Sequence, residues 1–222
     1  VPVVVQHSRL DSRQAELART TGTLLLLPYA LDYLAAVYIQ RGELSVAGEL
    51  LAEAEGLELG VRPEFPLRLA AFRGLASIAL LLVDVMNRGA LARGEGCAIA
   101  AVGYSEAVLY NGLGQYELAL EAAQKAIATD DIVVSSWTLY ELVEAATRTG
   151  ERDVARGAAD RLSERTAVLT SAWATGAALR SRALVADGAA AEDLHRQTIE
   201  CLEPSRMVWF EARARLSYGE WL

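Results

Sequence analysis

Residues 110–130 read YNGLGQYELALEAAQKAIATD, in which Gly114 is followed five positions later by Ala119. An apolar-periodic segment ends at this glycine and another begins there, as at the tight turn of a helical hairpin. We expect the alanine to lie where the two helices press together. The same pair recurs at intervals of 32 to 40 residues, as Gly42 and Ala47, Gly74 and Ala79, and Gly150 and Ala155, with an altered copy at Gly188 and Asp193. A repeat of this length predicts a stack of helix pairs.

The predicted fold class is all-α, with about five helical hairpins and an unpaired helix at each end. The hairpins are expected over about 30–55, 66–88, 97–129, 135–168 and 171–202. The last helix, over 205–222, has an apolar side formed by Val208, Ala212, Leu216 and Gly219, with no returning partner. Stacks of repeats need polar caps at their ends, and neither end has an obvious one. We therefore expect residues 1–222 to be a single helical-repeat domain and a segment of a longer protein.

Composition and charge argue against several classes of partner. The net charge is -8 and the pI is about 4.9, so the chain repels phosphate and is not expected to bind nucleic acid directly. The longest apolar run, 24–39, is broken by Pro28 and contains Asp32, which makes it too short and too polar for a membrane span. Cys97 and Cys201 lie in different hairpins without metal-ligand spacing, so we expect buried thiols of a reduced, cytoplasmic protein.

The sequence contains no recognisable catalytic or cofactor motif. Its histidines, His7 and His195, are expected on the surface, and neither has a second ligand nearby for zinc. There is no GxSxG elbow and no GxxxxGK[ST] loop, and the single lysine, Lys125, falls within a predicted helix. We therefore predict that this segment is not an enzyme and holds no cofactor or metal.

Two of the repeats resemble the tetratricopeptide consensus. In residues 110–130 the signature positions are Tyr110, Leu113, Gly114, Tyr116, Ala119, Leu120, Ala123 and Ala126. In LDYLAAVYIQRGELSVAGELLAEAE they are Leu34, Ala35, Tyr38, Gly42, Ala47, Leu51 and Ala54. This resemblance implies a right-handed superhelix in which the first helix of each pair lines the concave face.

A longer series of stretches resembles the helical-repeat region of the large ATP-binding LuxR-type transcription regulators of actinobacteria. The stretches are, in order, ARTTGTLLLLPYAL, EAVLYNGLGQYELALEAAQKA, SSWTLYELVEAATRTGERDVA, SRALVADG and EARARLSYGEWL. The resemblance covers about 18–222, and 62–87 fits least well and looks shortened. It implies a parent protein with a P-loop ATPase before the repeats and a helix-turn-helix after them, which the repeats regulate by receiving a small molecule or a partner.

The first helices of the fourth and fifth hairpins carry the candidate effector contacts. These are aromatic and charged residues: Trp137, Tyr140, Glu141 and Glu144 on one helix, and Trp173 and Arg180 on the other. If both helices line the concave face, the six residues meet in one groove, and aromatic platforms with a few charges suit a sugar or a peptide. Alternatively, the tryptophans fill gaps between repeats while the charges pair locally. Trp209, Phe210 and Trp221 are expected to pack against a helix beyond Leu222.

Two functions follow from this reading. The first is a sensor and protein-interaction module of a cytoplasmic LuxR-type regulator, which couples an effector or partner to the adjacent ATPase and helix-turn-helix domains. The second is a free-standing tetratricopeptide scaffold that binds a partner's peptide in its concave groove. The open terminal repeats also offer surfaces for self-association.

Overall fold

The computed structural model describes residues 13–58, 62–93, 96–129, 132–169 and 171–222, and these residues contain helices and no strand. The all-α prediction is confirmed. A helix over 13–21 is followed by α2 (Leu27–Gln40), α3 (Leu44–Gly56), α4 (Glu64–Phe72), α5 (Ala76–Arg93), α6 (Gly96–Gly112), α7 (Tyr116–Ile127), α8 (Ile132–Thr149), α9 (Arg152–Thr166), α10 (Ala172–Val185), α11 (Gly188–Leu202), the short 3₁₀ helix η1 (Glu203–Ser205) and α12 (Val208–Trp221). None of the described helices combines the length and hydrophobicity that crossing a bilayer requires.

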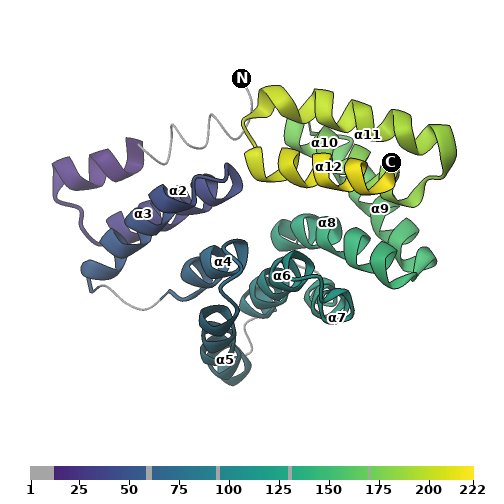
Figure 1. The fold of residues 1–222 in the computed structure, drawn as a ribbon. Coiled ribbons are helices and arrows are strands. Elements are labelled where there is room, and N and C mark those ends of the chain that lie inside the picture. Colours follow the sequence, from purple (N-terminus) through teal and green to yellow (C-terminus); the bar gives the residue numbers. More distant parts are fainter. Residues whose placement is uncertain (1–12, 59–61, 94–95, 130–131, 170) are drawn as a thin grey trace.

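Successive helices pack in pairs, and neighbouring pairs pack on each other. The pairs are α2 with α3, α4 with α5, α6 with α7, α8 with α9, and α10 with α11. Figure 1 shows that the pairs follow a curve, which brings the start of α12 beside α2 although the two helices lie at opposite ends of the sequence.

Each turn within a pair depends on a glycine with a positive φ angle. At Gly114 φ is 70°, and the flanking bonds run from Gly114 N–H to the Asn111 carbonyl and from Gln115 N–H to the Tyr110 carbonyl. This is the Schellman arrangement, which satisfies the last carbonyls of a helix and needs a left-handed residue that glycine supplies without strain. The other pair turns contain Gly42, Gly74, Gly150 and Gly188, also at positive φ. The sequence prediction of glycine turns is therefore confirmed.

The alanine of the repeat is the fourth residue of the second helix in every pair. Ala47, Ala79, Ala119 and Ala155 are all buried to within 1% exposure. In the fifth pair the turn is shorter, because α11 begins at Gly188 itself, so the fourth residue is Ala191 rather than Asp193. Ala191 is fully buried and Asp193 is exposed. The repeat that looks altered in sequence therefore keeps its packing position.

Two large apolar clusters form most of the core, and two smaller ones hold α2, α3, the helix over 13–21 and α4 together. One large cluster is built from α6 to α12, and the other from α4 to α6 with Val134 of α8. Trp137 of α8 and Trp209 of α12 pack against both. The last helix is therefore joined to the core at its N-terminal end.

Several expectations about single residues are wrong. The sequence predicts that Trp209 and Phe210 pack against a helix beyond Leu222, but they pack within this chain. Phe210 is 1% exposed in the core, and the Trp209 ring lies 4.7 Å from the Phe72 ring, measured between centroids. Cys97 is exposed rather than buried, and Cys201 is half-buried. His7 lies outside the described residues.

The apolar side predicted for the last helix faces outward. Val208 and Leu216 are more than half exposed, and Ala212 and Gly219 are also exposed. The opposite side of α12 carries the buried residues Phe210, Ala214 and Ser217.

Candidate functional site

The structure brings all six predicted contact residues into one cluster between α8 and α10. On α8, Tyr140 and Glu141 follow Trp137 by three and four residues, and Glu144 follows Glu141 by three, which places all four on one side of the helix. The Trp137 ring stacks on the Trp173 ring of α10 with centroids 4.1 Å apart. The guanidinium of Arg180 lies over the Tyr140 ring, 4.7 Å from its centroid.

Two carboxylates and two guanidiniums form the polar part of this cluster. Glu144 accepts a hydrogen bond of 2.6 Å from Arg180 Nη2 and another from Arg213 Nη2. Glu141 accepts from Arg213 Nη1 at 3.1 Å and from Asn111 Nδ2 of α6 at 2.9 Å. The formal charges cancel, which is what burying four charged groups requires.

The last helix, α12, contributes residues to the cluster that were not predicted from the sequence. Arg213 of α12 lies over the Trp209 ring at 4.7 Å and pairs with both carboxylates of α8. Phe210 packs edge-on against Tyr140 at a centroid distance of 5.2 Å. Arg213 is not among the residues predicted from the sequence, although an arginine one turn after Trp209 and Phe210 was an available signal.

Most of the cluster is buried. Tyr140, Glu141 and Arg180 are each 1% exposed, and Trp137 is half-buried. A ligand could therefore reach Tyr140, Glu141 and Arg180 only if a neighbouring helix moved away. This arrangement agrees with the alternative considered from sequence, in which the tryptophans fill the gap between repeats and the charges pair locally.

The electrostatics of the cluster favour the charged forms of Glu144 and Arg213. Burial alone would raise the pKa of Glu144, but Arg180 and Arg213 outweigh burial and lower this pKa to about 2. Burial opposes the charge of Arg213, whereas Glu141 and Glu144 raise the pKa of Arg213 above its ordinary value. Burial raises the pKa of Tyr140 to about 12, so its hydroxyl stays neutral.

Not every polar atom of the cluster is satisfied within the described residues. The buried atoms without a hydrogen-bond partner are Asn111 Oδ1, Tyr140 Oη, Trp173 Nε1, and Arg180 Nε and Nη1. Buried polar groups are normally hydrogen bonded, so these atoms mark places where water or a polar ligand group would be stabilised.

His195 is buried, contrary to the expectation of a surface histidine. It is 1% exposed and stacks on Tyr218 of α12 with centroids 5.4 Å apart. Burial, and secondarily the charge of Arg180, lower the pKa of His195 below its ordinary value. No group of histidine, cysteine, aspartate and glutamate in the described parts of the chain could hold a metal ion.

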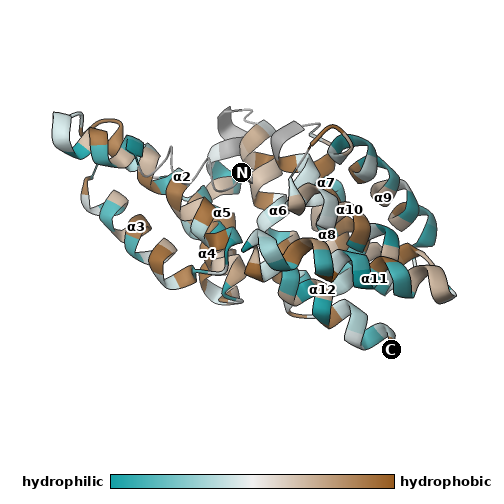
Figure 2. Ribbon diagram, turned by 90° about the horizontal axis from the view of Figure 1, so that it is seen from above, coloured by the Kyte–Doolittle hydropathy of each residue, from teal (hydrophilic) through white to brown (hydrophobic). Residues whose placement is uncertain are grey.

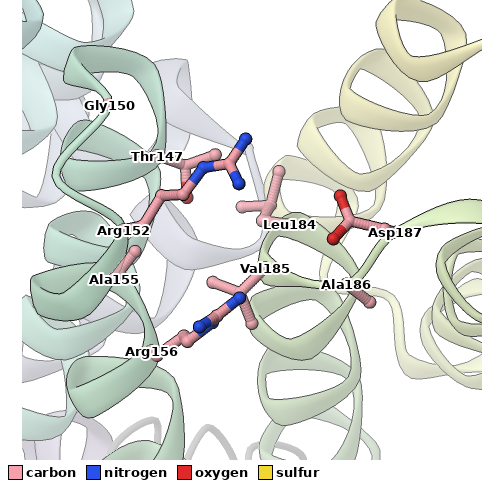
Figure 3. Close-up of a pocket in the computed structure, with 9 residues that line it drawn as sticks. All are labelled: Thr147, Gly150, Arg152, Ala155, Arg156, Leu184, Val185, Ala186 and Asp187. Atoms are coloured by element: carbon pink, nitrogen blue, oxygen red, sulfur yellow. The ribbon is translucent and has the colours of Figure 1, made fainter.

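Cavities lined by described residues also lie outside the cluster. One is a groove of about 660 Å³ between α3, α4 and α5, in the size range of ligand sites. Another, of about 210 Å³, lies between the α8–α9 turn and the end of α10. Figure 3 shows Arg152 and Arg156 of α9 on one side of this smaller cavity and Asp187 on the other. Its volume is below the range of typical ligand sites.

Comparison of the chain with protein-family models, curated proteins and solved structures gives no match. The geometry of the site shows a largely buried cluster of aromatic rings and ion pairs with no net charge, which connects α8, α10 and α12. We refer to this cluster as the joint.

Proposed function

We propose that this chain is the sensor and interaction module of a cytoplasmic LuxR-type transcription regulator, folded as a tetratricopeptide-like superhelix. The stretches that resemble the family and the five stacked helix pairs support this assignment. In this proposal the ATPase and helix-turn-helix activities belong to adjacent domains of the parent protein, and the present module has no catalytic role.

One observation carries the proposal: Arg180 of α10 and Arg213 of α12 share the carboxylate of Glu144 on α8. Each of these helices is the first of a pair or stands where the next pair would begin. A shift of one helix therefore changes the hydrogen bonds of the other two. In this proposal the ion pairs break when an effector binds and re-form when it leaves, and this change passes the binding event along the stack.

The chemistry of the joint limits what can replace α12. If α12 leaves, Glu141 loses Arg213, and a buried carboxylate without a cation is strongly disfavoured. An effector or partner segment that takes the place of α12 must therefore bring a cationic group to Glu141 and Glu144. It must also cover Tyr140 and Trp137 with apolar or aromatic surface.

The decisive test is the reading frame on either side of this chain. We expect a P-loop upstream and a helix-turn-helix downstream, and in that full-length protein Arg213→Ala should alter ATP hydrolysis or its response to DNA. A start codon near Val1 and a stop codon after Leu222 would contradict the regulator assignment.

A free-standing scaffold is the second candidate, because the open groove between α3, α4 and α5 offers a binding surface that needs no neighbouring domain. Self-association is a separate proposal, which rests on the exposed side of α12. Light scattering should show a concentration-dependent dimer, and a strict monomer would exclude it.

A further inference from the structure

The groove between α3, α4 and α5 exists because α4 is short. At 1.5 Å per residue, the nine residues of α4 span about 13 Å, whereas the eighteen residues of α5 span about 27 Å. The short helix therefore covers only part of its neighbours, and in the described residues α3 and α5 make no contact with each other. The result is a groove of about 660 Å³ at a position between two consecutive helix pairs.

Both walls and the floor of the groove are mainly apolar. Leu51 and Ala52 come from α3, Leu69 from α4, and Ile78 and Leu82 from α5. In Figure 2, hydrophobic stretches coloured brown are visible along α4 and α5.

The apolar face of α5 continues beyond the groove lining. Ile78, Leu81, Leu82 and Val85 are spaced by three and four residues and so share one side of the helix. Ile78 is 51% exposed, Leu81 63% and Val85 43%. The strip is about two turns long, and its i, i+3, i+4, i+7 spacing matches the apolar face of a partner helix.

The two ends of the groove differ in charge. Glu55 and Glu58 lie at the C-terminal end of α3, and Arg73 lies at the other end, where it donates to the Leu44 carbonyl at 2.7 Å. In the floor, Asp32 is buried and paired with Arg62. The end with the two glutamates is therefore acidic and exposed, and a bound segment gains most from basic residues there.

We propose that this groove binds an amphipathic helix of a partner protein, which has an apolar face and basic residues that meet Glu55 and Glu58. The inference rests on the interaction role proposed above, but it does not depend on the flanking ATPase and helix-turn-helix domains. Reading the flanking sequence tests those domains, whereas the experiment below tests the groove alone.

The probe is a fluorescently labelled synthetic peptide of about 18 residues, roughly five helical turns, with leucines on one face and lysines beside them. Fluorescence anisotropy with the full chain measures its affinity. We expect Ile78→Glu to weaken binding by at least about tenfold, because it places a charge in the apolar wall. Leu118→Glu is the matched control, since Leu118 is similarly exposed but lies on α7, away from the groove, and it should bind as the wild type does.

Charge reversal tests the second part of the proposal. The double variant Glu55→Lys and Glu58→Lys should bind the lysine peptide more weakly and should prefer a peptide with glutamate in place of lysine. Circular dichroism checks that each variant remains helical. Equal binding to wild type and Ile78→Glu would overturn the proposal, as would equal affinity of the wild type for the two peptides. If the wild type is a dimer and Ile78→Glu a monomer in light scattering, the groove binds a second copy, which also overturns it.

Discussion

The guanidinium of Arg213 on α12 is hydrogen bonded to the carboxylate of Glu144 on α8, which lies 69 residues earlier in the chain. The bond joins the last helix to the middle of the stack. Because Glu144 also binds Arg180, one carboxylate sets the relative positions of three helices. This relationship yields the first prediction.

Arg213→Ala should lower the free energy of unfolding by about 3 kcal/mol or more, because it leaves buried carboxylates without one of their cations. Urea denaturation monitored by circular dichroism measures the change. Arg215→Ala is the control, since Arg215 is on the same helix, is about half exposed and pairs with Glu211 and Glu203 at the surface. We expect that control to change stability by less than about 1 kcal/mol. Equal effects of the two substitutions would show that the buried joint does not hold α12.

Stability should fall in acid because Glu144 is charged in the folded state. Its pKa is about 2 in the fold against an ordinary value of 4.5, so the charged form favours folding above 4.5 and this contribution is lost as the pH falls from 4.5 to 2. The full contribution is on the order of 3 kcal/mol. Urea midpoints measured between pH 6 and 2 should drop steeply for the wild type.

The control for this titration is Glu144→Gln, which has no proton to gain at position 144. It should be less stable than the wild type at pH 6 and should lose less stability than the wild type between pH 4.5 and 2. Parallel curves for the two proteins would assign the acid sensitivity to other carboxylates.

The sequence predicts the helix pairs well but predicts the position of α12 poorly, because local patterns specify only local structure. A turn such as that at Gly114 is specified by neighbouring residues, and the buried Ala119 follows from the same short pattern. The place of α12 depends instead on contacts with helices that are distant in the sequence, such as α2 and α8. No local pattern specifies those partners. Arg213 could therefore be picked out as a candidate but its pairing with Glu144 could not be predicted, whereas the gathering of Trp137 with Trp173 could.

The burial of His195 is indicated by a pattern in the sequence that its charged neighbours obscure. Its sequence neighbours Glu192 and Arg196 suggest a surface position. However, Ala191, Thr198 and Leu202 recur with helical spacing around it, and all three are buried. The helical period, rather than adjacent charges, identifies the buried side of α11.

Burial of His195 should make the protein sensitive to mild acid. Its pKa is lowered in the fold, so the unfolded state, which protonates near the ordinary value of 6.5, gains a proton first as the pH falls. Stability should therefore decline as the pH falls below about 6.5, and His195→Gln should flatten that part of the curve. Thermal unfolding at several pH values measures it. A slope that is unchanged in His195→Gln would contradict the burial of a neutral histidine.

The turn glycines can be tested with two glycines that lie two residues apart. Gly114 has a φ of 70°, so Gly114→Ala forces a side chain into a left-handed conformation and should cost about 1–2 kcal/mol. Gly112 is the last residue of α6, and a methyl group added there meets nothing within 4 Å. Gly112→Ala should therefore be neutral or stabilise the protein by up to about 1 kcal/mol, because alanine restricts the unfolded chain.

The two variants differ from the wild type by the same methyl group, so opposite shifts in thermal midpoint would isolate the backbone conformation as the cause. If both substitutions destabilise equally, the turn at Gly114 does not require its left-handed residue.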